Sequence, residues 1–256
     1  MNTYNLFDLK GKVAIITGGG GGLGTQMATA FADAGSTVVL CSRKIENGEA
    51  AVAELQKRGA NAKAYACDVT DTDQVNKLVN DVIEEFGRID ILVNNSGTTW
   101  GETVEDMPLH AWEKVMNVNV TGTFLMSQAV GKHMIKQKAG KIINIASVAG
   151  LKAEPPEVLN AIGYSTSKGA VVHFTKDLAR KWAQHNITVN AIAPGFFPSK
   201  MTKVVLERRG DAIKEKNPMK RIGGEHDLKG VALLLASQAS DFVTGQIIAV
   251  DGGASL

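Results

Sequence analysis

The sequence predicts an α/β fold: a Rossmann-type, doubly wound parallel sheet of about seven strands, flanked by helices, in a single domain spanning residues 1–256. The first observation is that short β-branched runs alternate with longer segments of helical periodicity, which implies right-handed βαβ crossovers. The second is that most of these runs are almost continuously apolar, as strands are when helices cover both faces of a sheet. The third is that no linker, repeat or low-complexity tract divides the chain.

The strand candidates are spread along the whole chain, at residues 13–17, 37–40, 62–66, 89–93, 141–145, 188–193 and 246–250. Apolar residues recur at helical spacing in 23–34 and 75–86, and two longer helices are expected at about 111–137 and 161–185. The irregular stretches 148–163 and 194–218 each follow a predicted strand. Because ligands bind beyond the carboxyl ends of strands in open α/β sheets, both stretches are candidates for a pocket wall or a mobile lid, and residues 195–220 are predicted to be a substrate-loop insertion.

Composition and charge exclude several classes of function. Apolar residues make up 44% of the chain, which is enough for a sizeable core, and the formal net charge is only +2. No block of like charge suggests a nucleic-acid or membrane partner, and the longest apolar runs are too short to span a bilayer. The N-terminal residues lack the pattern of a signal peptide, so a cytoplasmic location is expected.

The two cysteines and five histidines do not suggest a metal site. Cys41 and Cys67 stand near the ends of predicted strands without metal-ligand spacing, and no histidine pair has the spacing of a zinc site. We therefore expect two buried thiols without a disulfide, and no bound metal.

A run of glycines, Gly18 to Gly22 followed by Leu23 and Gly24, joins the first predicted strand to an amphipathic segment. Such a run could be a flexible linker, but a turn between a buried strand and a helix must be tight. Glycines there let the backbone approach a pyrophosphate, and the helix N-terminus offers free N–H groups. A P-loop is excluded because no Lys-Ser or Lys-Thr follows the last glycine. The turn therefore predicts a dinucleotide site.

The second predicted strand ends in Ser42, Arg43 and Lys44, and no acidic residue appears before Glu46. An acidic residue at this place would bind the ribose 2′-OH of NAD, whereas a nearby arginine suits the 2′-phosphate of NADP. The sequence therefore favours NADP(H), with NAD(H) still possible. The alternative is a solvated basic loop.

Tyr164 and Lys168 stand four residues apart in a predicted helix, so their side chains share one face. An ammonium beside a phenol favours the phenolate and lowers its pKa, which makes a proton-transfer pair. Taken alone, the spacing is equally typical of a surface pair on an amphipathic helix.

Further motifs follow the strands in order. They are Thr17-Gly18 to Gly24, Asp68-Val69, Asn94-Asn95-Ser96-Gly97, Asn119, Ser147, Tyr164 with Lys168, and Pro194-Gly195. In this order and over residues 9–253 the chain resembles the short-chain dehydrogenase/reductase family. The resemblance implies an enzyme that interconverts a ketone and a secondary alcohol by hydride transfer to or from a nicotinamide cofactor.

The resemblance assigns catalytic roles to four residues: Asn119, Ser147, Tyr164 and Lys168. Tyr164 is expected to be the general acid and base, Ser147 to bond the substrate oxygen, and Lys168 to lower the Tyr164 pKa. Asn119 is expected to hold a water on the proton route. The alternatives are an ordinary strand-end serine at Ser147 and a helix residue bonded to a nearby carbonyl at Asn119.

The same resemblance, with the turn and basic loop above, assigns a set of cofactor-binding residues. These are Gly18, Gly22, Leu23, Gly24, Ser42, Arg43, Lys44, Asp68, Val69, Asn95, Ser96, Gly97, Tyr164, Lys168, Pro194, Gly195, Phe197 and Ser199. Gly21 departs from the family, because many NADP users have a basic residue there. That places 2′-phosphate binding on Ser42, Arg43 and Lys44.

The substrate is the least determined feature. The chain looks closest to the gluconate 5-dehydrogenase and 3-oxoacyl-carrier-protein reductase branches. Phe196, Phe197, Met201 and residues 155–159 are expected to shape an apolar pocket, which favours a 3-oxoacyl chain or another hydrophobic ketone over a sugar acid. Plain loop packing is the alternative for these residues. The cations Arg208, Arg209 and Lys214 either attract a carboxylate or phosphopantetheine or form a solvated helix face.

The resemblance also implies a homotetramer. An alternative of another class is a nucleotide-sensing protein that keeps the fold without the chemistry, although the complete Ser-Tyr-Lys-Asn set argues against it. An epimerase or dehydratase of the longer branch of the family is disfavoured by the chain length and the glycine spacing.

Overall fold

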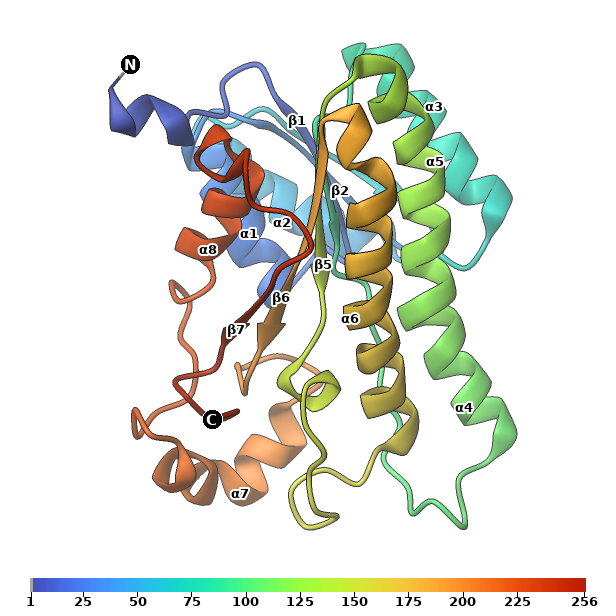
Figure 1. Ribbon diagram of the computed structural model, residues 1–256, viewed down its shortest axis with the longest axis vertical. Helices are drawn as coiled ribbons and strands as arrows, with labels where there is room; N and C mark the ends of the chain where they lie inside the picture. The colour runs from blue at the N-terminus through green and yellow to red at the C-terminus, as the bar shows by residue number, and fades with distance from the viewer. Residues whose placement is uncertain (1) are drawn as a thin grey trace.

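The computed structural model describes residues 2–256, which build one parallel sheet of seven strands with helices on both faces (Figure 1). The strands are β1 (Val13–Thr17), β2 (Thr37–Ser42), β3 (Ala62–Ala66), β4 (Ile91–Asn94), β5 (Gly140–Ile145), β6 (Ile187–Pro194) and β7 (Ile247–Val250). They lie in the order β3-β2-β1-β4-β5-β6-β7, and every neighbouring pair is parallel. The predicted fold class is confirmed.

The helices form two layers. They are α1 (Leu23–Asp33), α2 (Ile45–Lys57), α3 (Thr72–Phe86), α4 (Leu109–Met116), α5 (Gly122–Gln137), α6 (Ile162–Trp182), α7 (Lys203–Lys216) and α8 (Lys229–Ala236). Helices α1, α2 and α8 cover one face of the sheet, whereas α3, α5 and α6 cover the other (Figure 1). None of the helices within residues 2–256 is long and apolar enough to cross a membrane.

Strand β1 shows why the sheet has two cores. All five of its residues are buried, and its side chains alternate between the faces as the pleat requires. Ala14 and Ile16 pack under α1 and α2, while Val13 and Ile15 pack under α3 and α5. Because both faces of the strand are buried, the residues on both faces are apolar, which explains the continuous apolar runs in the sequence.

The expected strands all occur, with ends shifted by at most two residues. The expected helix 111–137 is instead divided, because a π-helical turn, Asn117–Thr121, separates α4 from α5. Helices α2 and α8 were not predicted as helices, and α7 lies within the stretch 194–218, which the sequence predicts to be irregular. The expected helix 161–185 ends as α6 at Trp182, followed by a 3₁₀ turn, Ala183–His185.

The strand order reverses direction beside β1. The chain builds β1, β2 and β3 outward, then returns through α3 to place β4 on the other side of β1. In doubly wound sheets such a switch point opens a crevice at the carboxyl ends of the strands. The glycine turn and the segment after β4 face each other there.

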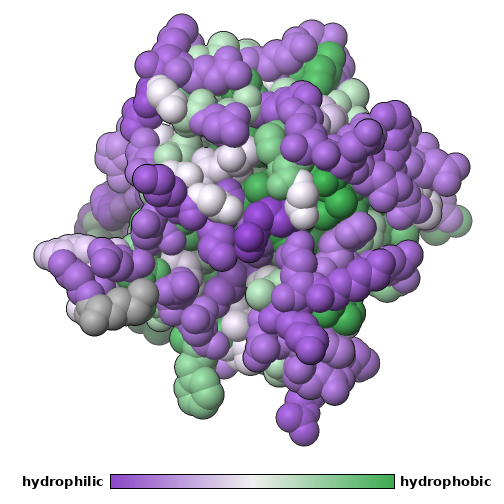
Figure 2. All heavy atoms as spheres, turned by 90° about the horizontal axis from the view of Figure 1, so that it is seen from above, coloured by the Kyte–Doolittle hydropathy of each residue, from purple (hydrophilic) through white to green (hydrophobic). Residues whose placement is uncertain are grey.

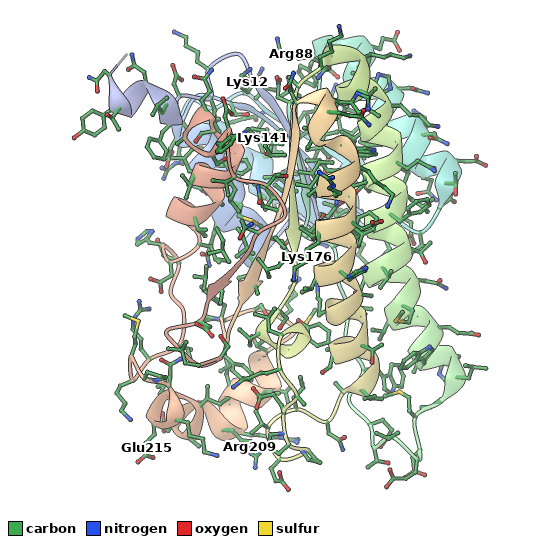
Figure 3. The ribbon with its side chains drawn as sticks, in the orientation of Figure 1. Lys12, Arg88, Lys141, Lys176, Arg209 and Glu215 are labelled. Atoms are coloured by element: carbon green, nitrogen blue, oxygen red, sulfur yellow. The ribbon has the colours of Figure 1, made fainter. Side chains whose placement is uncertain are left out.

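At the amino ends of the strands, opposite the crevice, charged side chains form ion pairs with one another. Figure 2 views this end and shows apolar atoms in its middle, surrounded by hydrophilic ones. Asp90 bonds to Arg88 and Lys12, and Lys141 pairs with Asp241 at 2.7 Å. Figure 3 shows Lys12, Arg88 and Lys141 at this end, far from the crevice. No residue predicted for the site lies here.

Candidate active site

A cleft of about 720 Å³ runs along the carboxyl ends of the strands. Almost all the predicted site residues line it: Gly18, Gly22, Leu23, Ser42, Arg43, Lys44, Asp68, Val69, Asn95, Ser96, Gly97, Ser147, Tyr164, Lys168, Pro194, Gly195, Phe197 and Ser199. Gly24 and Asn119 are the exceptions, and both support residues that do line it. The structure therefore brings together segments that the sequence separates by up to 180 residues.

The glycine turn has the shape of a phosphate cradle. Gly18 and Gly22 adopt positive φ angles of 61° and 58°, which favour glycine. A Cβ at Gly24 would lie 2.8 Å from the Asn95 amide, so glycine permits the close packing of α1. No atom lies within 4 Å of a Cβ placed at Gly21, and no side chain caps the start of α1. The free N–H groups of that helix thus face open space, which suits a dinucleotide pyrophosphate.

Thr17 and Asn95 bind the two sides of the crevice together. The Thr17 hydroxyl accepts hydrogen bonds from the backbone N–H groups of Asn95 and Ser96, each 2.9 Å long. The Asn95 amide donates to the carbonyls of Thr17 and Gly18, at 2.9 and 3.1 Å. Asn95 therefore shapes the turn through its side chain, beyond lining the cleft.

Basic side chains stand at the end of the cleft beyond β2. Arg43 and Lys44 are exposed, and neither has a carboxylate partner within residues 2–256. Asp68 is the one acidic residue that lines the cleft in the described chain, and its carboxylate accepts from the N–H and hydroxyl of Thr70. This end thus offers unpaired positive charge to an anion.

Lys168 lies on the second turn of α6 and is only 5% exposed. Its Nζ donates a 2.7 Å hydrogen bond to the carbonyl of Ile145, at the end of β5. Burial lowers the pKa of Lys168 to about 8, since desolvation penalises the ammonium form. Its Nζ lies 5.7 Å from the centre of the Tyr164 ring, so the i, i+4 pair does share one face.

Burial and the Ser147 hydroxyl act on the pKa of Tyr164 in opposite directions. Burial raises the pKa of Tyr164 above its usual value, and hydrogen bonding by Ser147 opposes that rise without reversing it. Lys168 directs its Nζ to the Ile145 carbonyl, and its expected lowering of the Tyr164 pKa stays a prediction. Tyr164 is therefore a protonated phenol at neutral pH.

Ser147 is brought to α6 by tight packing of the turn that follows β5. The 3₁₀ turn Val148–Gly150 begins right after Ser147, whose hydroxyl accepts from the N–H of Ala149 at 3.2 Å. A Cβ at Gly150 would lie 2.5 Å from the backbone of Lys168. Only glycine allows this approach, so the local backbone sets the Ser147 position relative to Tyr164.

Asn119 is buried in the π-helical turn between α4 and α5 and does not line the cleft. Its side-chain oxygen accepts from the N–H of Thr98 at 2.8 Å, and its amide donates to the Thr98 carbonyl and the Ser167 hydroxyl, each at 2.9 Å. All these bonds join protein groups, so the side chain is a clamp between the segment after β4 and α6. Its expected water-holding role stays a prediction.

The pocket residues expected from the sequence are only partly in place. Met201 lines the cleft, but Phe196 and residues 155–159 do not. Phe197 is 3% exposed, and a Cβ on Gly223 would clash with its ring, so the ring itself is a core side chain. Arg209 and Glu215 lie on the outer side of α7 (Figure 3), as a solvated helix face requires.

Sequence reasoning missed several residues that line the cleft: Gly20, Gly21, Asn47, Cys67, Thr98, Val118, Ile145, Ala146, Lys200 and Thr202. Most are neighbours of predicted residues, so the strand-end rule alone would have included them. Asn47 is different, because it reaches the turn only through the close approach of α2 to Gly20. Within residues 2–256 no three His, Cys, Asp or Glu side chains cluster as metal ligands.

Comparison with known proteins identifies the family. The model of the short chain dehydrogenases matches residues 12–210, which include the glycine turn, Ser147, Tyr164 and Lys168. The chain belongs to this family. The family includes 3-oxoacyl-carrier-protein reductases and 5-ketogluconate reductases, which are oxidoreductases that act on CH–OH groups. This protein is an enzyme of that class.

Two curated short-chain dehydrogenases represent the branches. The chain is 38% identical to the 3-oxoacyl-[acyl-carrier-protein] reductase of Thermotoga maritima, over 96% of this chain and 98% of the relative. It is 37% identical to the gluconate 5-dehydrogenase of Gluconobacter oxydans, over 99% and 98% of the two chains. Among solved structures, a gluconate 5-dehydrogenase from Burkholderia cenocepacia, in complex with NADP and tartrate, matches with a TM-score of 0.94 at 35% identity, covering 99% of each chain.

Proposed function

We propose that the enzyme is an NADP(H)-dependent ketone reductase and alcohol dehydrogenase in which Tyr164 is the general acid and base. The observation that carries the proposal is the convergence of three groups at one end of the cleft. These are the Tyr164 phenol, the Ser147 hydroxyl that lowers its raised pKa, and the buried Lys168. Tyr164 is the one phenol that lines the cleft within the described residues.

The residues along the cleft fit a nicotinamide dinucleotide. The uncapped start of α1 and the open space at Gly21 suit its pyrophosphate, and Asp68 and Val69 are proposed to hold the adenine end. The carboxyl-end segment Pro194–Ser199 is proposed to contact the nicotinamide end. A bound cofactor would supply or accept the hydride.

NADP(H) is proposed over NAD(H) because Arg43 and Lys44 are exposed and unpaired where the ribose phosphate is expected. The Ser42 hydroxyl donates to the Lys44 carbonyl at 2.6 Å, which shapes this loop. Fluorescence titration with both reduced cofactors tests the proposal. Tighter binding of NADH than of NADPH contradicts it.

Three side chains, those of Tyr164, Ser147 and Lys168, are proposed to take part in proton transfer to the substrate oxygen. In reduction of a ketone, charge grows on the carbonyl oxygen, which needs a hydrogen-bond donor and then a proton. Tyr164 enters the reaction protonated, because burial raises its pKa, and it would deliver the proton. Ser147 would donate to the same oxygen, and Lys168 would place its ammonium where it stabilises the phenolate that results.

The proposed substrate is a 3-oxoacyl compound or another hydrophobic ketone. Support comes from the apolar side chains that line the cleft near the catalytic groups, Val118, Ile145, Ala146 and Met201. A sugar acid of the gluconate type is the second candidate. It is favoured by exposed Lys200, which lines the cleft without a carboxylate partner within residues 2–256 and could bind a substrate carboxylate.

A turnover screen separates the two candidates. Purified enzyme is assayed with acetoacetyl thioesters, 5-ketogluconate and simple aromatic ketones, each with NADPH and NADH. Turnover of thioesters or aromatic ketones alone supports the hydrophobic ketone. If 5-ketogluconate is the better substrate and Lys200→Ala raises its KM without affecting other ketones, the sugar-acid candidate replaces it.

We also propose that the enzyme is a homotetramer and that it is cytoplasmic. Light scattering of the purified protein tests the first proposal, and fractionation of the source cells tests the second. Tight cofactor binding without turnover of any carbonyl compound would instead favour a nucleotide-sensing protein.

A further inference from the structure

The chain's two cysteines, Cys41 and Cys67, stand at the carboxyl ends of the neighbouring strands β2 and β3, in one core cluster. Cys41 belongs to β2 and pairs with Tyr65 of β3, and the N–H of Cys67 donates to the Ser42 carbonyl at 3.0 Å. Since Cys67 follows Tyr65 by two residues, its side chain emerges on the same face of the sheet as that of Cys41. Both sulfurs enter the core under α3.

The two thiols differ in their surroundings. The neighbouring Cys67 thiol and burial raise the pKa of Cys41 well above its usual value, whereas the neighbouring Cys41 thiol lowers the pKa of Cys67. Both are free and buried, but Cys67, 2% exposed, lines the cleft, whereas Cys41, 0% exposed, does not. The thiol that more readily forms the thiolate is thus the one that a small molecule in the cleft can meet.

We propose that Cys67 and Cys41 form a peroxide-oxidisable pair that closes to a disulfide and weakens dinucleotide binding. In the first step the Cys67 sulfur attacks hydrogen peroxide, the O–O bond breaks, and a sulfenic acid and one water form. In the second step the Cys41 sulfur attacks the Cys67 sulfur, the S–O bond breaks, and the second water leaves. Two thiols lose two electrons, and one peroxide gains them.

The effect on binding follows from what the two residues adjoin, and this part rests on the proposed dinucleotide site. Ser42 follows Cys41, and Asp68 follows Cys67; both line the cleft. The Cys41 carbonyl also accepts from the N–H of Gly18 at 2.8 Å, at the start of the phosphate turn. A disulfide demands a narrow range of Cβ separation and torsion, so closing it shifts the ends of β2 and β3 beneath these groups.

The oxidation is tested on the whole protein with hydrogen peroxide alone. Intact mass spectrometry and thiol titration follow the reaction, and both thiols of the chain are accounted for because it has only two cysteines. The expected result is loss of both thiols and of two hydrogen atoms per chain, with no covalent dimer, and full reversal by dithiothreitol. Survival of both thiols, or a product that carries only added oxygen, overturns the pair.

The consequence is tested by NADPH fluorescence titration of the reduced and oxidised protein. The dissociation constant is expected to rise several-fold on oxidation, and NADPH added first is expected to slow the loss of thiols because it covers Cys67. An unchanged dissociation constant overturns the effect on binding. If the reduced protein binds no dinucleotide, the proposed function fails, while the mass measurement still decides whether the thiols form a disulfide.

Cys41→Ala and Cys67→Ala identify the attacking sulfur. Cys41→Ala is expected to stop at a Cys67 sulfenic acid that dimedone labels, whereas Cys67→Ala is expected to resist peroxide. Dimedone labelling of Cys41 in the Cys67→Ala variant, at a rate like that of Cys67, overturns the order of steps. Thermal unfolding and NADPH binding establish that each variant is folded, and the wild-type mass measurement stands without them.

Discussion

The two ends of the cleft are built differently. At the end with the proposed catalytic residues, Lys168, Ser147 and Asn119 are buried; Lys168 and Asn119 have hydrogen-bond partners from other elements, and Ser147 has one in the turn that it caps. At the adenosine end, Arg43 and Lys44 are exposed and unpaired within residues 2–256. The difference teaches that the scaffold determines the chemistry of this enzyme, because buried polar groups tolerate one arrangement. The side chains that we propose set its cofactor preference are not held by packing.

Tyr164→Phe tests the catalytic end most severely. Loss of the phenol removes the proton donor, so kcat is expected to fall by about 10³-fold, as removal of a general acid does. Steady-state kinetics with the best ketone measures it, and NADPH affinity should change little. In the wild type, the raised Tyr164 pKa predicts that ketone reduction persists into alkaline solution.

The exposed Tyr4, 84% accessible, provides the matched control. Tyr4→Phe should retain wild-type kinetics. If Tyr164→Phe turns over ketone at the rate of this control, the phenol is not the acid.

Lys168→Met examines the cost of a buried ammonium. Activity is expected to fall by about 10²-fold, the lower end for loss of a group that stabilises the reacting charge.

The effect of Lys168→Met on the free energy of unfolding depends on pH, because the pKa of Lys168 is about 8 in the folded state and 10.5 is its ordinary value. Below pH 8 both states hold the proton, so the folded wild type bears the full cost of burying the charge. Between the two values the unfolded state binds more protons, so wild-type stability rises with pH.

The measurement is urea unfolding of wild type and Lys168→Met from pH 7 to pH 10. The stability of the variant relative to wild type is expected to decline over this range, by up to about 3 kcal/mol for a shift of this size. Lys176, exposed on the same helix (Figure 3), is the control. Lys176→Met should show no such decline, and an identical pH dependence in both variants would refute the burial argument.

How much the sequence could predict follows the same division. The strand-end rule sufficed to place Gly18 and Ser147 in one cleft, because parallel strands end at one edge, whereas Tyr164 and Lys168, on a helix, were placed there by the family resemblance. The direction of the Tyr164 pKa could not be predicted, since it depends on burial by segments distant in sequence. The π-helical turn that holds Asn119 has no local signal, because it is stabilised by bonds to Thr98 and Ser167.

Asn119→Ala breaks the clamp between Thr98 and Ser167. Three hydrogen bonds are lost and buried backbone groups stay unpaired, so the free energy of unfolding is expected to drop by about 2–3 kcal/mol. A fall in kcat of about tenfold is expected as Thr98 and α6 lose register. Urea unfolding and steady-state kinetics measure the two effects.

Thr121, exposed on the same π-helical turn, is the control. Thr121→Ala removes a hydroxyl whose one contact is a 3.5 Å approach to Asn117. Equal destabilisation by both variants would show that the turn, and not the Asn119 clamp, is the sensitive feature.

Arg43→Ala tests the adenosine end, where the smallest effect is expected. Arg43 is exposed, so its attraction to a phosphate is screened by water and salt, and the NADPH dissociation constant should rise by about tenfold at low ionic strength, near the lower limit for a charged hydrogen bond. NADH binding should be unchanged, because NADH lacks the 2′-phosphate. Arg180, exposed on α6 and outside the cleft, provides the matched control for lost charge.

The preference for NADPH over NADH should shrink as salt is added to the wild type and should stay small in Arg43→Ala at every salt concentration. If Arg43→Ala weakens both cofactors equally, the arginine shapes the loop without reading the phosphate. The two ends of the cleft would then differ in exposure but not in what they recognise.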